Sequence, residues 1–238
     1  MSVLEKRPLA AAPLASGSKL APSASQLPPA GGVTAGAEIG DIRFRTLLGE
    51  TAWAQLPEAV QRRFSKRLAL GDTIIYRGEV LTTELSPVGR VLSFLGRAIG
   101  APLPLTDGAT GPALVLVSED AELGGQCWLR IYTRAGKFPQ AIHSAKRFRG
   151  PTGLEEYVGS GIGMALQVSV EAGALVFRSA GYFLALGDRR LPLPGFLCPG
   201  QMRIEHRDLG DGSFAFTLEL VHRLMGRLVH QLAHFRDA

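Results

Sequence analysis

Residues 202–220 read Met-Arg-Ile-Glu-His-Arg-Asp-Leu-Gly-Asp-Gly-Ser-Phe-Ala-Phe-Thr-Leu-Glu-Leu, and this stretch indicates the fold more clearly than any other. Apolar side chains alternate with polar ones on both sides of a central Gly-Asp-Gly, with Met202 and Ile204 before it and the series from Phe214 to Leu220 after it. Successive side chains of a strand point to opposite faces of a sheet. The stretch therefore predicts a β-hairpin that turns through the two glycines.

Working outward from this hairpin, the same β pattern continues upstream through most of the chain. Short runs rich in β-branched and aromatic residues predict further strands, at residues 73–85, 113–118, 126–133, 138–149, near 157, 166–171, 175–178 and 182–186. No helical pattern separates the later strands, which excludes a parallel βαβ sheet. We predict a mainly β (α+β) fold, with one large curved antiparallel sheet or half-open barrel and two or three N-terminal-side helices.

Helical periodicity is confined to the part of the chain before residue 100. Two short helices are predicted at residues 42–48 and 57–68. A third is predicted at residues 86–99, where Ser86 and Pro87 supply the cap and the first turn. Its apolar positions share one face, which we expect to close the concave side of the sheet: Val88, Val91, Leu92, Leu95, Ala98 and Ile99.

The composition divides the chain after residue 40. Of its 238 residues, 46% are hydrophobic and 20% are charged, which is enough to bury a core. Residues 1–40 are instead dominated by Ala, Pro, Ser and Gly and bury too little to order themselves. We predict a disordered tail at 1–40 and a single β-rich domain at 41–238. Pro8 and Pro13 interrupt the apolar run that a secretory leader would need, although a targeting role for residues 1–40 stays open. No apolar run of the chain is long enough for a transmembrane segment.

Charge and cysteine content bound the partners and the compartment. The net charge is +5, but the basic residues are spread along the chain, so no nucleic-acid partner is expected. The basic runs at 62–67 and 146–149 are interpreted as solvated faces. Cys127 and Cys198 are interpreted as buried, reduced thiols, and we predict a cytoplasmic protein.

The usual catalytic motifs are absent from the sequence. Residues 159–163 are rich in glycine but lack the spacing of a dinucleotide loop. His230 and His234 are one helical turn apart, yet Gln231 stands where a zinc protease has its general base. We therefore predict no cofactor and no metal, and the catalytic residues, if any, stay unknown.

Seven short motifs occur in a characteristic order between Phe44 and Phe235. They are Phe44-Arg-Thr-Leu-Leu-Gly49, Leu56-Pro57, Tyr76-Arg-Gly78, Gly100-Ala-Pro102, Trp128-x-Arg130, Glu205 ahead of Asp211-Gly-Ser-Phe214, and Leu224-Met-Gly226-Arg-Leu-Val229. In these motifs the chain resembles the bacterial domain-of-unknown-function family numbered 4166. The resemblance implies no activity. Domains of that family are sometimes joined to saccharopine-dehydrogenase-like NAD(P)-binding domains, so it implies a dehydrogenase-like protein as a partner.

One strand carries the candidate site. Trp128, Arg130 and Tyr132 alternate along it and share a face. If that face lines a cavity, Arg130 can hold a carboxylate or a phosphate while the two rings enclose an apolar body. The alternative is an exposed face on which Arg130 pairs with an acid such as Glu205. Trp128, Arg130, Tyr132 and Glu205 are the predicted ligand-binding residues.

Three functions stay open at this point. The leading hypothesis is a binding or accessory domain that encloses a small apolar or amphipathic ligand. The second is an enzyme with an acid-base site outside the known motifs, using Glu205 with His206 or Asp208 near Arg130. The third is a protein-interaction module for a dehydrogenase-like partner, which an exposed apolar patch would indicate.

Overall fold

The structure, a computed structural model, describes residues 39–69, 71–100, 102–120, 122–187 and 189–237. The predicted tail at 1–40 lies outside these ranges except for its last two residues. Ile39 and Gly40 form the strand β1 (Ile39–Gly40), which pairs with β2 (Lys66–Arg67).

The remaining elements follow the predicted order. The helices are α1 (Arg43–Leu48), α2 (Glu50–Trp53), α3 (Glu58–Phe64) and α4 (Pro87–Leu95), with the 3₁₀ turns η1 (Gly96–Ile99) and η2 (Gly195–Leu197). The further strands are β3 (Thr73–Leu85), β4 (Gly111–Asp120), β5 (Gly125–Arg134), β6 (Lys137–Arg147), β7 (Glu155–Gly159), β8 (Ile162–Glu171), β9 (Ala174–Leu186), β10 (Arg189–Pro192), β11 (Gln201–Gly210), β12 (Ser213–His222) and β13 (Gly226–Arg236). The mainly β prediction with a few helices on the N-terminal side is confirmed.

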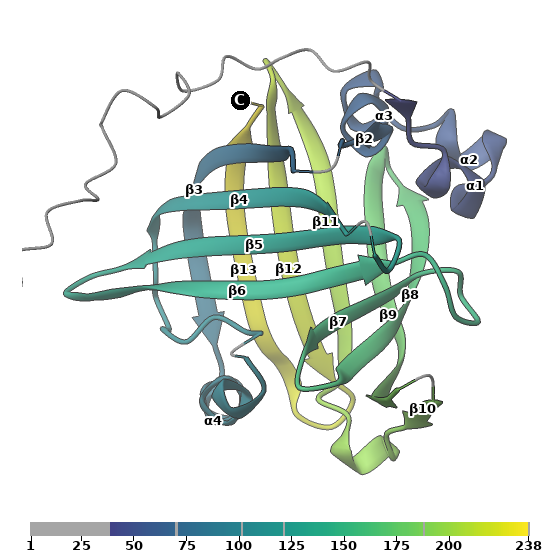
Figure 1. Ribbon diagram of the computed structural model, residues 1–238. Coiled ribbons are helices and arrows are strands. Elements are labelled where there is room, and N and C mark those ends of the chain that lie inside the picture. The colour runs from purple at the N-terminus through teal and green to yellow at the C-terminus, as the bar shows by residue number, and fades with distance from the viewer. Residues whose placement is uncertain (1–38, 70, 101, 121, 188, 238) are drawn as a thin grey trace, which may run out of the picture. The chain divides into compact units, whose positions relative to one another are not determined.

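The long strands close into an antiparallel barrel (Figure 1). Around the ring the order is β9-β11-β12-β13-β3-β4-β5-β6-β7-β8, and β8 pairs with β9 to complete it. The predicted hairpin at 202–220 is the pair β11–β12. The curved antiparallel sheet is therefore confirmed, and the barrel is closed rather than half-open. Closure gives each ring strand two neighbours and defines an interior and an exterior.

The strand β9 joins two segments that the sequence indicated separately, 175–178 and 182–186. Its first half pairs with β11, and its second half pairs with the short outer strand β10. The register with β8 shifts so that Ala165 and Leu166 face Gly181 and Ser179, which leaves Ala180 as an extra residue. This is a β-bulge, and the bend it introduces lets the edge of β9 that faces away from β8 pair first with β11 and then with β10.

The helices α1, α2 and α3 cover one side of the barrel, at the upper right of Figure 1. Helices α1 and α2 contact β8, and α3 contacts β11. Phe44 of α1 is completely buried and meets the rings of Phe64, Phe148 and Phe177 edge-on at centroid distances of 5.1, 5.0 and 6.0 Å. Such edge-to-face clusters dominate core energetics, so this cluster fixes the helices to the strands.

Helix α4 is capped as predicted, but it packs differently from the prediction. Ser86 accepts the N-cap hydrogen bond from Gly89 N at 3.0 Å. However, most of the predicted apolar face does not close the sheet, because Val91 and Leu95 are 58% and 62% exposed, although Leu92 packs against the core. The buried side of α4 carries Gly89 and Ser93 instead. A Cβ at Gly89 would overlap the carbonyl oxygen of Leu228, so the missing side chain is what lets the helix lie against β13.

This close approach makes a prediction about two glycines at α4. In an ordinary helix, Gly→Ala stabilises by about 1 kcal/mol. We expect Gly89→Ala to destabilise the protein by about 1–3 kcal/mol instead, because the new methyl group overpacks against a backbone carbonyl. Gly96→Ala is the matched control, since its Cβ would meet only Pro102 at an ordinary 3.4 Å. Urea unfolding of both variants measures the difference, and equal stabilities would contradict the packing described.

Candidate functional site

A cavity lies inside the barrel beside α3. Its volume is about 50 Å³. Aromatic and aliphatic side chains make up most of its wall, together with a small set of polar groups. The lining residues that carry a polar group are Arg63, Lys66, Gln126, Trp128, Arg130, Tyr132, Lys146 and His206. The apolar lining residues include Phe177, Phe214, Phe216 and Phe235.

Three of the four predicted site residues meet in this cavity. Trp128, Arg130 and Tyr132 all line it from β5. Arg130 and Tyr132 are buried, and Trp128 retains partial exposure. The face they share is therefore an interior face. The same alternation places Cys127 on the outside, where it is exposed, and Cys198 is only half-buried, so the expectation of two buried thiols is wrong.

The fourth predicted residue, Glu205, lies elsewhere. Its carboxylate pairs with Arg203 at 2.6 Å and with Arg207 at 2.8 Å. Its neighbours Ile204 and His206 line the cavity, so the strand alternation turns Glu205 to the outer face. The interpretation that pairs Arg130 with Glu205 is thus corrected. For the same reason Glu205 and His206 do not converge as an acid-base pair.

Arg130 is instead part of a buried ionic cluster with Lys146 of β6 and Glu156 of β7. Lys146 Nζ lies 3.1 Å from Glu156 Oε1, and Arg130 Nη2 lies 3.4 Å from the same oxygen. Arg130 Nη1 also donates to Ser144 Oγ at 3.2 Å. Lys146 Nζ stands 4.7 Å from the centre of the Trp128 ring, a cation–π contact. Two basic side chains therefore share one carboxylate, and the cluster has a surplus positive charge when Lys146 is protonated.

The protonation states of the cluster follow from its geometry. Burial disfavours the charged form of Glu156, but Lys146, Arg130 and hydrogen bonds from Ser144 and Lys146 outweigh it and lower the pKa to about 2. Glu156 is thus ionised at neutral pH. Burial also lowers the pKa of Lys146, with Arg130 acting in the same direction and Glu156 opposing both. Glu156 is thus the group that favours the charged form of Lys146.

A further basic group, Arg63 of α3, also reaches the cavity. Its side chain is buried, with Nε 2.9 Å from Asp237 Oδ1 and Nη1 2.9 Å from Asp208 Oδ1. The guanidinium lies 4.7 Å from the centre of the Phe214 ring. Two carboxylates, those of Asp208 and Asp237, therefore neutralise Arg63, whereas Arg130 and Lys146 share the single carboxylate of Glu156. The surplus charge lies at the β5–β6 wall.

His206 brings a neutral polar group to the cavity. It lies between Phe214, whose ring is tilted by 31° at a centroid distance of 4.3 Å, and Phe64, which it meets edge-on at 5.1 Å. Burial above all, with a smaller contribution from Arg63, lowers the pKa of His206 to about 3, and Asp237 opposes both. Among the described residues its Nε2 has no hydrogen-bond partner, and the same holds for Trp128 Nε1 and Gln126 Oε1. The wall thus offers donors and acceptors that the protein itself leaves unused.

A smaller cavity of about 40 Å³ adjoins the first. The two share Arg130, Tyr132, Ile204 and Phe216 as lining residues. Glu156 lines the smaller one only, and Pro102 and Pro104, after η1, help to close it. Helix α4 itself lines neither cavity. Arg130 therefore stands between two spaces, with an ion-pair partner on one side and the larger cavity on the other.

Lys146, Arg63 and Glu156 were missed as site residues, although the first two stand in basic runs that the sequence indicated as solvated. Lys146 is buried because it continues the inward phase of Ile142 and Ser144 along β6. Extending that alternation by one more step would have found it. Arg63 and Glu156 gave no such signal, because the partners of Arg63 lie far away in the sequence and those of Glu156 come from other strands.

The part of the chain that the structure describes holds no cluster of three His, Cys, Asp or Glu side chains able to bind a metal. Nor does it contain a helix that is both apolar enough and long enough to cross a membrane.

Comparison with known proteins bears on the family alone. A family model described as a domain of unknown function, DUF4166, matches residues 56–235. No curated protein and no solved structure matches the chain. The matched range contains α3, α4 and the barrel strands from β3 to β13, except for the last residue of β13. This confirms the resemblance that the short motifs indicated, and the chain belongs to the DUF4166 family of domains of unknown function.

Proposed function

We propose that this domain binds a small amphipathic molecule inside the barrel, with a carboxylate or a similar anionic group held at Arg130 and Lys146. The observation that carries the proposal is the surplus positive charge of a buried cluster in an otherwise apolar cavity. A buried charge without full compensation is unfavourable. An anionic ligand group would supply the missing compensation, so the site favours anions over neutral or cationic molecules of equal size.

The two cations suit different parts of this task. Arginine has a planar guanidinium that matches a carboxylate in a two-point geometry. Lysine acts as a compact charge beside it. The unused Trp128 Nε1 can donate a further hydrogen bond to the ligand, and the neutral His206 Nε2 can accept one. These groups would fix the orientation of the polar end.

The apolar part of the ligand would lie among the phenylalanine rings. Phe177, Phe214, Phe216 and Phe235 supply this wall. Ligand sites commonly combine such an apolar lining with a few convergent polar groups. The volume of about 50 Å³ limits the ligand to a small molecule unless side chains move on binding. A short-chain or medium-chain organic acid has the matching chemistry.

Titration with hexanoate or octanoate, followed by tryptophan fluorescence, tests this proposal. Trp128 lines the cavity, whereas Trp53 is buried among the helices, so ligand entry should change the emission of Trp128. We expect Arg130→Met to weaken binding at least about tenfold, since a hydrogen bond to a charged group contributes about 1.5–3 kcal/mol. Arg130→Lys should retain part of the affinity.

Two controls make the result specific. Arg77→Met removes an exposed arginine of β3 and should leave the affinity unchanged. Trp128→Phe should abolish the fluorescence change while calorimetry still detects binding. Equal affinity of the Arg130→Met and Arg77→Met proteins for octanoate would reject the proposed head-group site.

A further inference from the structure

Three neighbouring segments expose large apolar side chains at one end of the barrel. Phe94 and Leu95 project from α4, Leu224 is 80% exposed in the turn between β12 and β13, and Phe196 is 86% exposed in η2. Val91, Leu197 and Met225 are exposed beside them. A monomeric protein seldom shows so many protruding apolar groups together unless they meet a partner. We call these residues the apolar rim.

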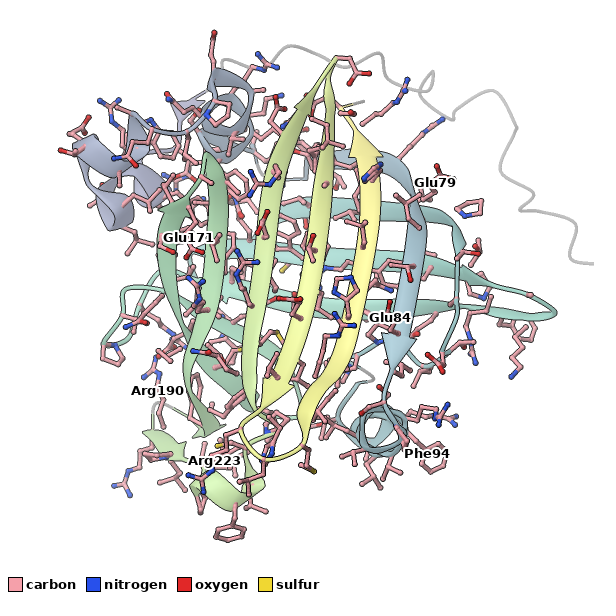
Figure 2. All side chains as sticks on the ribbon, turned by 180° about the vertical axis from the view of Figure 1, so that it is seen from behind. Glu79, Glu84, Phe94, Glu171, Arg190 and Arg223 are labelled. Atoms are coloured by element: carbon pink, nitrogen blue, oxygen red, sulfur yellow. The ribbon has the colours of Figure 1, made fainter. Side chains whose placement is uncertain are left out.

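The three segments are adjacent in space. Gly89 of α4 lies against the backbone of Leu228, just after the β12–β13 turn, and Gly200, just after η2, lies against Val221, just before that turn. Figure 1 shows α4, the turn and β10 along its lower edge. Figure 2, seen from behind, shows Phe94 and Arg223 at the same edge. The apolar rim is therefore a single surface rather than three scattered patches.

The charge around the rim has one sign. Residues 87–97, 189–200 and 222–227 contain six arginines and no aspartate or glutamate. Three of the arginines pair with acids from neighbouring segments, namely Arg90 with Asp107, Arg190 with Glu155 and Arg227 with Glu84. Arg97, Arg189 and Arg223 form no ion pair with any acid among the described residues. The rim thus carries unpaired positive charge between its apolar side chains.

We propose that the apolar rim docks this domain onto the surface of an anionic lipid bilayer. Interfacial binding combines apolar side chains that enter the boundary of the acyl chains with basic side chains that remain among the head groups. The rim has both kinds of residue, intermixed on one surface. Its side chains protrude from turns and a short helix, which suits insertion into a fluid layer. This inference does not depend on the ligand proposed for the cavity.

Sedimentation of the full chain with phospholipid vesicles tests the proposal. We expect at least tenfold tighter binding to vesicles that contain phosphatidylglycerol than to pure phosphatidylcholine, and a loss of binding as salt is raised. The double variant Phe94→Ser, Leu224→Ser should weaken binding to the anionic vesicles at least tenfold. Phe138→Ser is the matched control, because Phe138 is 91% exposed near the β5–β6 turn and lies outside the rim. It should bind like the parent protein.

Melting curves of all variants verify that they fold, which is expected of the rim and control variants because their substituted side chains are exposed. Arg130→Met should bind vesicles unchanged, which separates this test from that of the cavity. Equal binding to both vesicle types, no binding, or equal effects of the rim and control variants would overturn the proposal. So would a rim-dependent dimer in sedimentation velocity without lipid, because the rim would then serve a second copy of the chain.

Discussion

Glu156→Gln is expected to lower the free energy of unfolding by about 3–5 kcal/mol, the range for breaking a buried ion pair by removing one partner. The substitution keeps the shape of the side chain but removes the only carboxylate that Arg130 and Lys146 share at 3.4 and 3.1 Å. Both cations would then be buried without a counter-charge. Burial already lowers the pKa of Lys146, so loss of its proton would relieve only part of this penalty.

Urea unfolding at neutral pH measures this loss, and Glu84→Gln supplies the matched control. Glu84 pairs with Arg227 at 2.6 Å, but both side chains are about half exposed. An exposed pair of this kind contributes about 0–1 kcal/mol. If the two variants lost the same stability, the cluster would not be the charged, buried arrangement described. Added octanoate should restore only part of the stability that Glu156→Gln loses, since its carboxylate compensates only one of the two positive charges.

Acidification is expected to destabilise the protein already below pH 6.5, because of His206. Its pKa is about 3 in the folded protein, against 6.5 for the ordinary side chain. Between these values the unfolded chain binds a proton that the folded protein excludes, so stability is full above pH 6.5 and falls as the pH decreases. Over two pH units the loss from this single group reaches about 2–3 kcal/mol. Glu156 adds to the loss only below its ordinary pKa of 4.5.

The free energy of unfolding should therefore be compared at pH 6.5 and 4.5 for three proteins. His206→Phe keeps an aromatic ring beside Phe64 and Phe214 and should show a change about 2–3 kcal/mol smaller than the parent protein. His143→Gln removes an exposed histidine of β6 and should behave like the parent. A parent protein whose pH dependence equals that of His206→Phe would show that His206 is not buried as a neutral group.

Local sequence patterns predicted the strands and much of the interior. Alternation alone placed Trp128, Arg130 and Tyr132 on one face, since side-chain direction in a strand depends only on the parity of the position. What alternation does not contain is which strands become neighbours. The pairing of Arg130 with Glu156 depends on the register of β5, β6 and β7. Glu205 was wrongly grouped with Arg130 because that register is a property of the closed barrel.

Helix α4 shows the other limit of sequence reasoning. Its periodicity correctly predicted a helix with an apolar face, and Ser86 correctly predicted its start. A pattern indicates that a face is apolar but not what covers it. Here Gly89 determines the side that meets β13, and Val91, Phe94 and Leu95 are exposed while Leu92 packs against the core. Only the structure shows that the apolar face belongs to a surface.

Calorimetry with hexanoate and hexanamide tests most directly whether a buried surplus of positive charge makes the barrel an anion receptor. The two molecules have nearly the same size and shape and differ in charge. We expect hexanoate to bind at least about tenfold more tightly, with the difference lost in Arg130→Met. Equal affinities, or no binding of either molecule, would contradict this account of the interior.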